Sequence, residues 1–215
     1  MEKCKNNKSF ILITCLITLF PMIAGLLLWQ KLPEQIATHF GSGNVPNGWS
    51  SKGFTVFGIP LFILAAHLLC TFFTAVDPKR QHIDEKLYKI ILLICPAVSL
   101  VCGISIYTYA LSIDINIAFF VKIFVGLLFI FIGNYLPKCR QNYSIGIKLP
   151  WTLDSEENWN RTHRLAGWLW VVAGLLFLLT AFFHINSGWT FLIIAALLTF
   201  IPCCYSFLLY HKTNK

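Results

Sequence analysis

The sequence has few charged residues and, in particular, few acidic ones. Only 9 of its 215 residues are Asp or Glu, and charged residues make up 12% of the chain, against roughly 25% in a soluble domain. Hydrophobic residues reach 57%. Because a spanning helix needs about 20 apolar residues, the chain has room for about six spans and little else. A large water-soluble catalytic domain, a disordered chain, a collagen-like chain and a secreted disulfide scaffold are therefore excluded.

The sequence also lacks the patterns typical of nucleic-acid, disulfide and metal sites. The net charge is +8, but no basic stripe carries interleaved aromatic rings, so we expect no direct nucleic-acid binding. The eight cysteines include no C-x-x-C pair, which argues against a zinc or redox framework. His39 and His184 are the candidate metal ligands, but zinc usually takes at least three protein ligands. We therefore expect no metal and no cofactor.

Six apolar runs are long enough to cross a membrane and predict an all-α integral membrane protein with six transmembrane helices, multi-pass in a bacterial cell membrane. The first run follows lysines, as in a signal peptide, but its apolar core is too long and has no small-x-small cleavage site. The runs are 10–29, 54–76, 88–111, 117–136, 165–184 and 189–210.

The distribution of Lys and Arg predicts the orientation. The N-terminal segment has three of these residues, the first loop two (Lys31 and Lys52), the second loop three, the fourth loop five and the C-terminal tail two, while the third and fifth loops have none. Because Lys and Arg are retained on the cytoplasmic side of short loops, both termini are predicted to be cytoplasmic. The first loop, 30–53, is then extracellular, and the fourth loop, 137–164, is cytoplasmic.

The spans divide into two halves of three, an N-terminal half (1–111) and a C-terminal half (112–215). Because each half has an odd number of spans, the second half enters the membrane in the opposite orientation to the first. This is the arrangement of a 3+3 inverted repeat, which we state as a hypothesis. In the second half, Gly126 and Gly133 share a seven-residue spacing with Gly167 and Gly174. Small residues on one face allow close approach of helices in lipid, so the fourth and fifth spans are predicted to pack together.

Proline positions predict distortions of individual spans. Pro96 and Pro202 fall inside the third and sixth runs, and each removes a backbone hydrogen-bond donor and should kink its helix. Pro60 lies near the start of the second span, where it costs less.

The first loop is unusual for a connector. Its start favours one or two helical turns, after which its Gly and Pro residues enforce turns. Trp49 and Lys52 suit an anchor at the membrane interface. Two interpretations remain open here, an outward binding element or an ordered cap on the helices. The candidate binding or sensing residues are Pro33, His39, Gly43, Gly48, Trp49 and Lys52.

The fourth loop is rich in uncharged polar residues and aromatic rings. Asp154 is predicted to cap a helix that continues into the fifth span, with Glu157 at its third position. Glu157 and Arg161 are spaced to form an i,i+4 ion pair. A simple interpretation is an amphipathic helix lying at the interface. That does not explain why Asn and His residues accumulate where lipid meets protein, since such groups need hydrogen-bond partners.

These residues resemble the signature of the SdpI family of bacterial immunity proteins. The matching runs are GNYLP at 133–137, NYSIGIKLPWTL at 142–153 and WNRTHRLAG at 159–167. The first loop, with Leu32-Pro33, His39, Gly43, Gly48, Trp49 and Lys52, is similar to the small uncharacterised domain at the N-terminus of that family. The likeness covers nearly the whole chain.

The resemblance implies a polytopic membrane protein that protects its cell from a secreted, membrane-active peptide toxin. The best-known member of the family also signals the presence of the toxin, by holding a winged-helix autorepressor at the membrane. The resemblance therefore implies such an autorepressor as a further partner. The candidate cytoplasmic signalling residues are Asn134, Asn142, Gly146, Trp151, Thr152, Trp159, Asn160 and His163.

Two other functional classes remain as alternatives. A small transporter or flippase fits kinked helices and an inverted repeat, but proton-coupled carriers usually need acidic residues in their spans, and this chain has almost none there. A membrane enzyme could use His163 with Asp154 or Glu157 as an acid/base pair. No nucleophile motif or metal cluster accompanies them, so we do not expect an enzyme.

Overall fold

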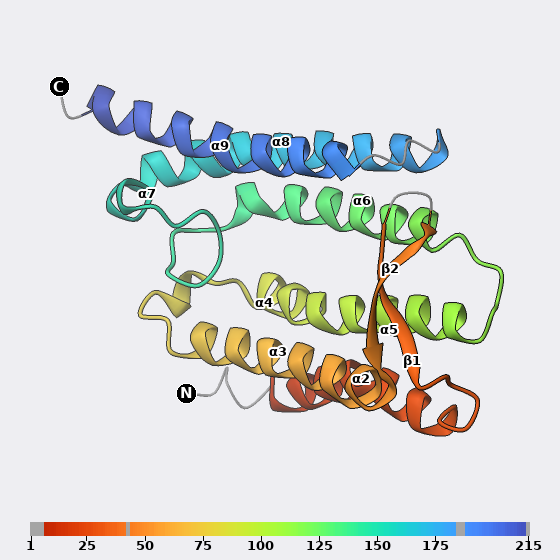
Figure 1. Cartoon of the computed structure of the whole chain (residues 1–215). Helices are drawn as coiled ribbons and strands as arrows, with labels where there is room; N and C mark the ends of the chain where they lie inside the picture. Colours follow the sequence, from red (N-terminus) through yellow and green to blue (C-terminus); the bar gives the residue numbers. More distant parts are fainter. Residues whose placement is uncertain (1–6, 42–43, 184–187, 214–215) are drawn as a thin grey trace. The chain divides into compact units, whose positions relative to one another are not determined.

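The described part of the chain is mostly helical and has six segments that are long and apolar enough to cross a membrane, which confirms the predicted fold class. The computed structural model describes residues 7–41, 44–183 and 188–213. Figure 1 shows the helices in chain order. The six spans are Lys8–Leu27, Phe54–Ala75, Glu85–Ala110, Ile117–Lys138, Glu156–Phe182 and Trp189–Lys212.

Several of these spans are assembled from more than one helix. The helices are α2 (Lys8–Leu27), η2 (Phe54–Gly58), α3 (Ile59–Ala75), η3 (Arg80–His82), α4 (Glu85–Leu92), α5 (Ile94–Ala110), α6 (Ile117–Tyr135), η4 (Leu136–Lys138), α7 (Pro150–Asp154), α8 (Glu156–Phe182) and α9 (Gly188–Thr213). The third span breaks at Leu93, between α4 and α5. Pro96 cannot donate to the carbonyl of Leu92, which confirms the predicted distortion there. Helix α9 contains Pro202 without a break, so a kink at this position stays a prediction.

The first loop forms a β-hairpin, so the prediction of one or two helical turns at its start is wrong. Strand β1 (Gln35–Phe40) pairs antiparallel with β2 (Pro46–Ser51), with irregular register around His39. Thr38 and Ser50 are joined across the strands by a hydroxyl–hydroxyl hydrogen bond of 3.1 Å. A short local sequence does not show that a second strand lies ten residues further on, and pairing with that strand decides the conformation.

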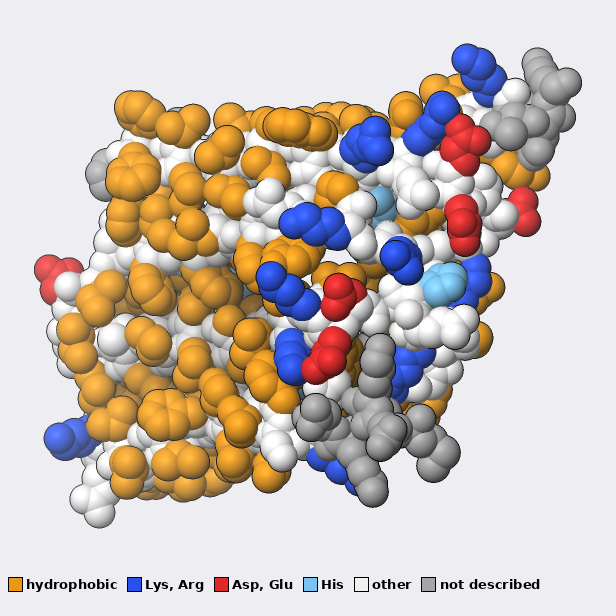
Figure 2. Space-filling model, turned by 180° about the vertical axis from the view of Figure 1, so that it is seen from behind, with side chains coloured by type: hydrophobic (Ala, Val, Ile, Leu, Met, Phe, Trp, Pro, Cys, Tyr) orange, Lys and Arg blue, Asp and Glu red, His pale blue; other side chains and the backbone are white. Residues whose placement is uncertain are grey.

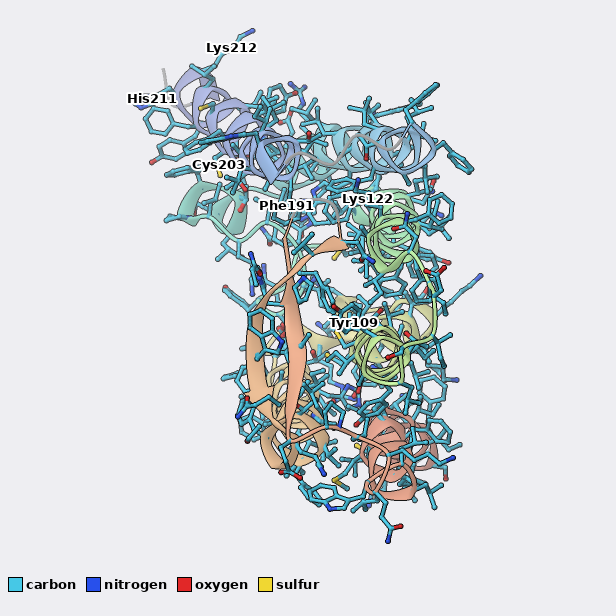
Figure 3. All side chains as sticks on the ribbon, turned by 45° about the vertical axis from the view of Figure 1, so that its right-hand side comes forward. Tyr109, Lys122, Phe191, Cys203, His211 and Lys212 are labelled. Carbon is cyan, nitrogen blue, oxygen red and sulfur yellow. The ribbon has the colours of Figure 1, made fainter. Side chains whose placement is uncertain are left out.

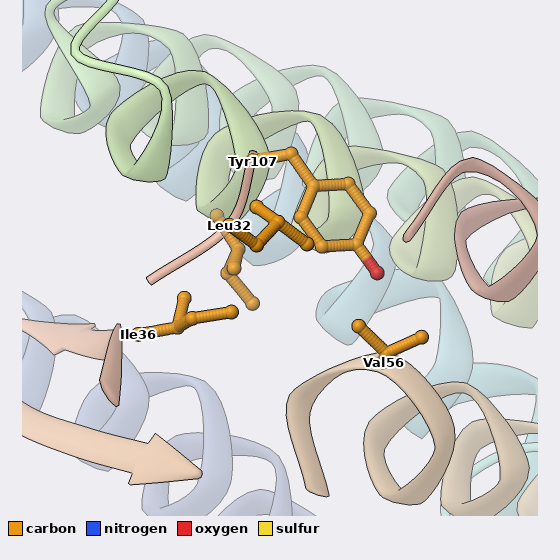
Figure 4. Packing of buried hydrophobic residues seen from close by; sticks show 5 residues of the cluster. Leu32, Ile36, Val56 and Tyr107 are labelled. Atoms are coloured by element: carbon orange, nitrogen blue, oxygen red, sulfur yellow. The ribbon is translucent and has the colours of Figure 1, made fainter. Parts of the chain in front are cut away.

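The chain forms two compact units, residues 1–72 with 88–118 and residues 73–87 with 119–215. In the first unit, a hydrophobic cluster holds the hairpin base against α5 and η2. Figure 4 shows this cluster around Leu32, Ile36, Val56 and Tyr107. Tyr109 on α5, labelled in Figure 3, packs edge to face on Phe40 of β1, with ring centroids 4.9 Å apart. The hairpin is therefore a fixed part of this unit.

The same unit also contains hydrogen bonds at membrane depth. The Thr14 hydroxyl and the His67 ring lie 2.9 Å apart, and both side chains are buried. The Ser99 hydroxyl donates to the carbonyl of Thr18 at 2.7 Å, which joins α5 to α2. Because water is absent from the bilayer core, these polar groups must find partners within the protein, and here they connect helices.

In the second unit, α6 and α8 approach closely at their glycines. A Cβ atom on Gly174 would lie 2.5 Å from the carbonyl oxygen of Gly126, and one on Gly167 would lie 2.7 Å from that of Gly133. Phe129 on α6 packs on Trp170 and Phe177 of α8. The predicted packing of the fourth and fifth spans is confirmed.

The orientation can be tested by labelling from outside. An impermeant thiol reagent applied to intact cells is expected to label Val45→Cys but not Lys148→Cys, in a background whose other accessible cysteines are replaced by serine. Val45 is 61% exposed in the hairpin loop, and Lys148 is exposed in the basic fourth loop, which positive charge should retain inside. Both variants should react after permeabilisation. Labelling of Lys148→Cys in intact cells would reverse the orientation.

Candidate functional site

The segment between η4 and α8, residues 139–155, is a folded loop held by side-chain hydrogen bonds to the backbone. We call it the 139–155 loop. Asn142 lies at its centre and is fully buried. Its side-chain oxygen accepts from the N–H groups of Ser144 (2.9 Å) and Ile145 (2.7 Å), and its amide nitrogen donates to the carbonyl of Arg140 (2.8 Å). One asparagine therefore fixes a turn that has no regular secondary structure.

His163 on α8 binds the loop backbone through its ring. Its Nδ1 donates to the carbonyl of Trp159 at 2.8 Å, and its Nε2 accepts from the N–H of Ile147 at 2.9 Å. Because a carbonyl only accepts and a backbone N–H only donates, these two bonds fix the neutral imidazole with its proton on Nδ1. Both ring nitrogens are occupied, so His163 positions the loop and has no nitrogen free for acid/base work.

Trp159 and Gly146 complete the packing around that histidine. The Trp159 ring stacks on His163 with centroids 4.0 Å apart, and its Nε1 donates to the carbonyl of Cys139 at 2.7 Å. Gly146 has φ of +111°, and a Cβ there would lie 2.3 Å from His163 Nε2. A glycine is required here both by the backbone conformation and by the closeness of the ring.

Thr152 and Gln141 hold α7, which lies at the end of the 139–155 loop, against the rest of the loop. The Thr152 hydroxyl accepts from the N–H of Leu149 at 2.8 Å and donates to the carbonyl of Ile147 at 2.8 Å. The Gln141 amide nitrogen donates to the carbonyls of Thr152 and Leu153, each at 2.9 Å. Both side chains are buried, so every hydrogen bond here replaces one to water.

The loop also binds the second loop of the chain, which the sequence analysis did not find. Asp77, just after the second span, accepts from the N–H of Tyr143 at 2.9 Å and from the hydroxyl of Ser144. Lys79 Nζ donates to Gln141 Oε1, and His82 Nδ1 donates to the Gln141 carbonyl at 2.8 Å. A carboxylate directly after an apolar run was the available signal, because burying it is expensive without partners.

A second missed group joins α8 to α9. The Asn158 side chain donates to the carbonyl of Ser206 at 2.9 Å, and its oxygen accepts from the hydroxyls of Ser206 (2.8 Å) and Thr162 (3.0 Å). All three side chains are buried. The sequence signal was an asparagine and a threonine four residues apart on one helix face.

Other predicted residues of the fourth loop lie outside this network. Asn134 is exposed and donates to Ile130 within its own helix, and Asn160 is exposed on α8. Trp151 packs on Phe207 and Tyr210 of α9. Asn134 and Asn160 are thus set apart by their exposure, and Trp151 by its packing on another helix.

The start of α8 differs by one residue from the prediction. Ser155, rather than Asp154, caps the helix, and its hydroxyl accepts from the N–H of Asn158 at 3.2 Å. Asp154 is instead the last residue of α7. The short helix α7 and the long helix α8 meet at Ser155, so Asp154 has a helical rather than the extended conformation that a cap requires. The Glu157–Arg161 ion pair is confirmed at 2.7 Å.

Cys139 opens the 139–155 loop and is buried. Burial raises the pKa of its thiol to about 11, so the thiol is protonated at neutral pH and unreactive. It donates to the carbonyl of Ile145 at 3.5 Å. Cys139 is thus a structural residue of the loop.

The hairpin presents some of the predicted residues of the first loop and buries others. Trp49 is 56% exposed, and His39 and Pro33 are also exposed. The His39 ring hydrogen-bonds to the Asn47 side chain across the strands. Gly48 pairs with His39, and a Cβ on it would lie 3.0 Å from the His39 Cβ.

Lys52 anchors the base of the hairpin from a buried position. Its Nζ forms a 2.8 Å ion pair with Glu34 and lies over the Trp29 ring, 5.2 Å from its centroid. The two residues predicted to form an interface anchor therefore differ in burial. The Trp49 ring is exposed, whereas the Lys52 side chain is buried. Gly43 and His184 lie outside the described residues. In the part of the chain that the structure describes, no three His, Cys, Asp or Glu residues come together as a metal site.

Both structured regions coincide with segments recognised in known proteins. Residues 138–206 match the model of the SdpI/YfhL protein family, and residues 16–64 match DUF1648, a domain of unknown function. The chain is also 31% identical over 184 residues to the immunity protein SdpI of Bacillus subtilis (strain 168), which covers 83% of each chain. The chain belongs to the SdpI family. No solved structure matches it.

The boundaries of the two matches follow the geometry. The SdpI/YfhL match begins at Lys138, directly before the 139–155 loop, and ends at Ser206, the partner of Asn158 on α9. The DUF1648 match contains the whole hairpin and its anchors. In this SdpI family protein, which is a multi-pass protein of the cell membrane, the hairpin and the 139–155 loop thus each lie within a segment that a family model matches.

Proposed function

We propose that this chain is an immunity protein that protects its cell from a secreted, membrane-active peptide toxin, and that the hairpin is where the toxin is met. The observation that carries the proposal is the identity of 31% across 83% of the chain to an immunity protein. That similarity, together with the two family matches, includes both the hairpin and the 139–155 loop.

The hairpin has the properties of a preorganised binding surface. Its base is fixed by the Lys52–Glu34 ion pair and by the Ile36 cluster, while the Trp49 ring and the His39 side chain are exposed. A rigid element that presents an exposed aromatic ring loses little conformational entropy on binding. Aromatic side chains also dominate the binding energy of many interfaces. An apolar peptide at the membrane surface is a suitable ligand for such a face.

The 139–155 loop is suited to a different role on the other side of the membrane. Its buried hydrogen bonds give it one defined shape, and its rim carries Tyr143 and Lys148 as exposed side chains. We place the contact with a cytoplasmic partner here, and a winged-helix autorepressor is the partner that the family resemblance implies. An acid/base role is not proposed for His163, because the backbone occupies both its ring nitrogens.

Loss of the exposed hairpin side chains is expected to weaken protection. Trp49→Ala and His39→Ala should each lower the toxin concentration that cells survive by about tenfold, the effect of losing one contact of about 1.4 kcal/mol. Trp168→Ala is the matched control, since Trp168 is also exposed, at 70%, but lies on α8. Survival is measured at equal protein levels in a toxin-sensitive host.

A second measurement in the same cells separates protection from signalling. Lys148→Ala and Tyr143→Ala should leave survival unchanged but reduce toxin-dependent recruitment of a tagged regulator to the membrane. If instead the hairpin variants survive normally and the loop variants are sensitive, the loop neutralises the toxin and the assignment of roles is wrong. Equal losses in all variants and in the control would show that both regions serve folding alone.

A further inference from the structure

A polar cavity lies beside the 139–155 loop, at the first turn of α8. Its volume is about 300 Å³, and its walls carry His82, Arg140, Gln141, Glu156 and Asn160. This volume is at the lower end of the range found for small-molecule sites. The cavity lies within one unit of the chain, so its walls are contributed by elements that pack together.

Most of the polar groups in this wall are not used by the fold. Gln141 is occupied by its bonds to α7 and Lys79. His82 uses only Nδ1, which leaves Nε2 available. Within the described part of the chain, the Arg140 guanidinium, the Glu156 carboxylate and the Asn160 amide make no hydrogen bond or ion pair. A cation, an anion, an amide and an imidazole nitrogen are therefore open to a ligand.

The charges select a ligand that carries both signs. A guanidinium binds phosphate oxygens through two parallel hydrogen bonds, which makes Arg140 the natural partner of a phosphate group. Glu156 accepts hydrogen bonds from an ammonium group and repels a second anion. The Asn160 amide can both donate and accept, and so can contact either end of such a ligand. A phosphate joined to a primary amine satisfies all of these groups.

The position of the cavity along the spans indicates where the ligand comes from. Arg140 follows the end of the span Ile117–Lys138, Glu156 begins the span Glu156–Phe182, and His82 precedes the span that begins at Glu85. These ends lie at the depth of the lipid headgroups when the spans cross a bilayer. On the face drawn in Figure 2, charged side chains gather at the border of a surface covered by hydrophobic ones. Lipid headgroups are present at this depth at all times.

We infer that this cavity binds the phosphoethanolamine headgroup of a membrane phospholipid, with Arg140 on the phosphate and Glu156 on the ammonium. A phosphoglycerol headgroup has no cation for Glu156. A phosphocholine headgroup has a cation but no N–H to donate, and its methyl groups need more space. The site should therefore prefer phosphoethanolamine lipids over both. This inference stands on the cavity alone and does not depend on which toxin or partner the protein meets.

The experiment measures thermal stabilisation of the full-length protein in detergent by added lipids with identical acyl chains and ethanolamine, glycerol or choline headgroups. The ethanolamine lipid is expected to act at about tenfold lower concentration than the other two. Arg140→Gln should weaken all three by about tenfold, because it removes the phosphate contact. Glu156→Gln should abolish only the preference for ethanolamine. Arg161→Gln is the control, since its exposed guanidinium pairs with Glu157 and does not line the cavity.

A fourth addition, free phosphoethanolamine without acyl chains, distinguishes the two sources of this chemistry. Stabilisation by the lipid at far lower concentration than by the free compound supports a membrane lipid as the ligand. Equal potency would assign the cavity to a soluble phosphoamine instead and overturn the lipid assignment. Equal stabilisation by all three lipids, unchanged in Arg140→Gln and Glu156→Gln, would overturn the site altogether. Arg140 and Glu156 are exposed, so both variants should fold.

Discussion

Gly146→Ala is expected to lower the free energy of unfolding by about 3 kcal/mol. An alanine at φ of +111° is strained by about 1–3 kcal/mol, and its Cβ would lie 2.3 Å from His163 Nε2. Moving the ring away breaks its bond from the Ile147 N–H and leaves this partly buried donor unsatisfied, at a cost of about 1–3 kcal/mol. Local relaxation of the structure should reduce each of these costs, so we expect a total of about 3 kcal/mol.

The measurement is the melting temperature of the purified protein in detergent, together with protection against toxin. Gly53→Ala is the matched control, because nothing lies within 4 Å of a Cβ at Gly53 and its φ is −59°. Adding His163→Ala to Gly146→Ala should partly restore the melting temperature, since it removes the ring that the new methyl group meets. If Gly146→Ala melts like the wild type, the loop does not need the conformation described above.

Gly174→Leu is expected to destabilise the second unit by about 3 kcal/mol or more. Its Cβ alone would lie 2.5 Å from the Gly126 carbonyl oxygen and 2.7 Å from the Ile130 side chain. The remaining side-chain atoms have no room unless α6 and α8 separate. In lipid, helices associate through close packing rather than through a hydrophobic force, so separation loses the main interaction between these two spans.

Val172→Leu on the same helix is the control, because Val172 is 49% exposed, so an added methylene there can extend away from the protein. The melting temperature of Gly174→Leu should fall by roughly 5–10 °C, while that of Val172→Leu should not change. The melting temperature of Gly174→Ala, which adds only a Cβ atom, should lie between those of the other two variants. An unchanged melting temperature for Gly174→Leu would mean that the two helices do not depend on this contact.

Prediction from the sequence succeeded for the spans and for contacts set by helical spacing. Hydropathy located the six spans, because the bilayer imposes their length on any sequence that crosses it. The glycine spacing located the contact between α6 and α8, and the i,i+4 rule located the Glu157–Arg161 pair. These features depend on residues close in the chain or on one helix face.

Prediction was less complete for the two loops. Asn142, Gly146, Thr152, Trp159 and His163 were all selected from the sequence, but the hydrogen bonds that join them were not. Asp77 and His82 also bond to the loop, at Tyr143, Ser144 and Gln141, and they lie 59 to 67 residues before these partners in the chain. No local pattern indicates which distant segment will supply a missing donor or acceptor.

The sequence by itself determined that this protein crosses the membrane six times, since the cost of placing charge and unpaired backbone in lipid leaves no other arrangement for such runs. Only the tertiary structure decided that the first loop pairs with itself as a hairpin, that Lys52 points inward to Glu34, and that Ser155 caps α8. These outcomes depend on which groups meet in space. A buried side chain takes the partner that replaces its lost water, and that partner is set by the packing of the whole unit.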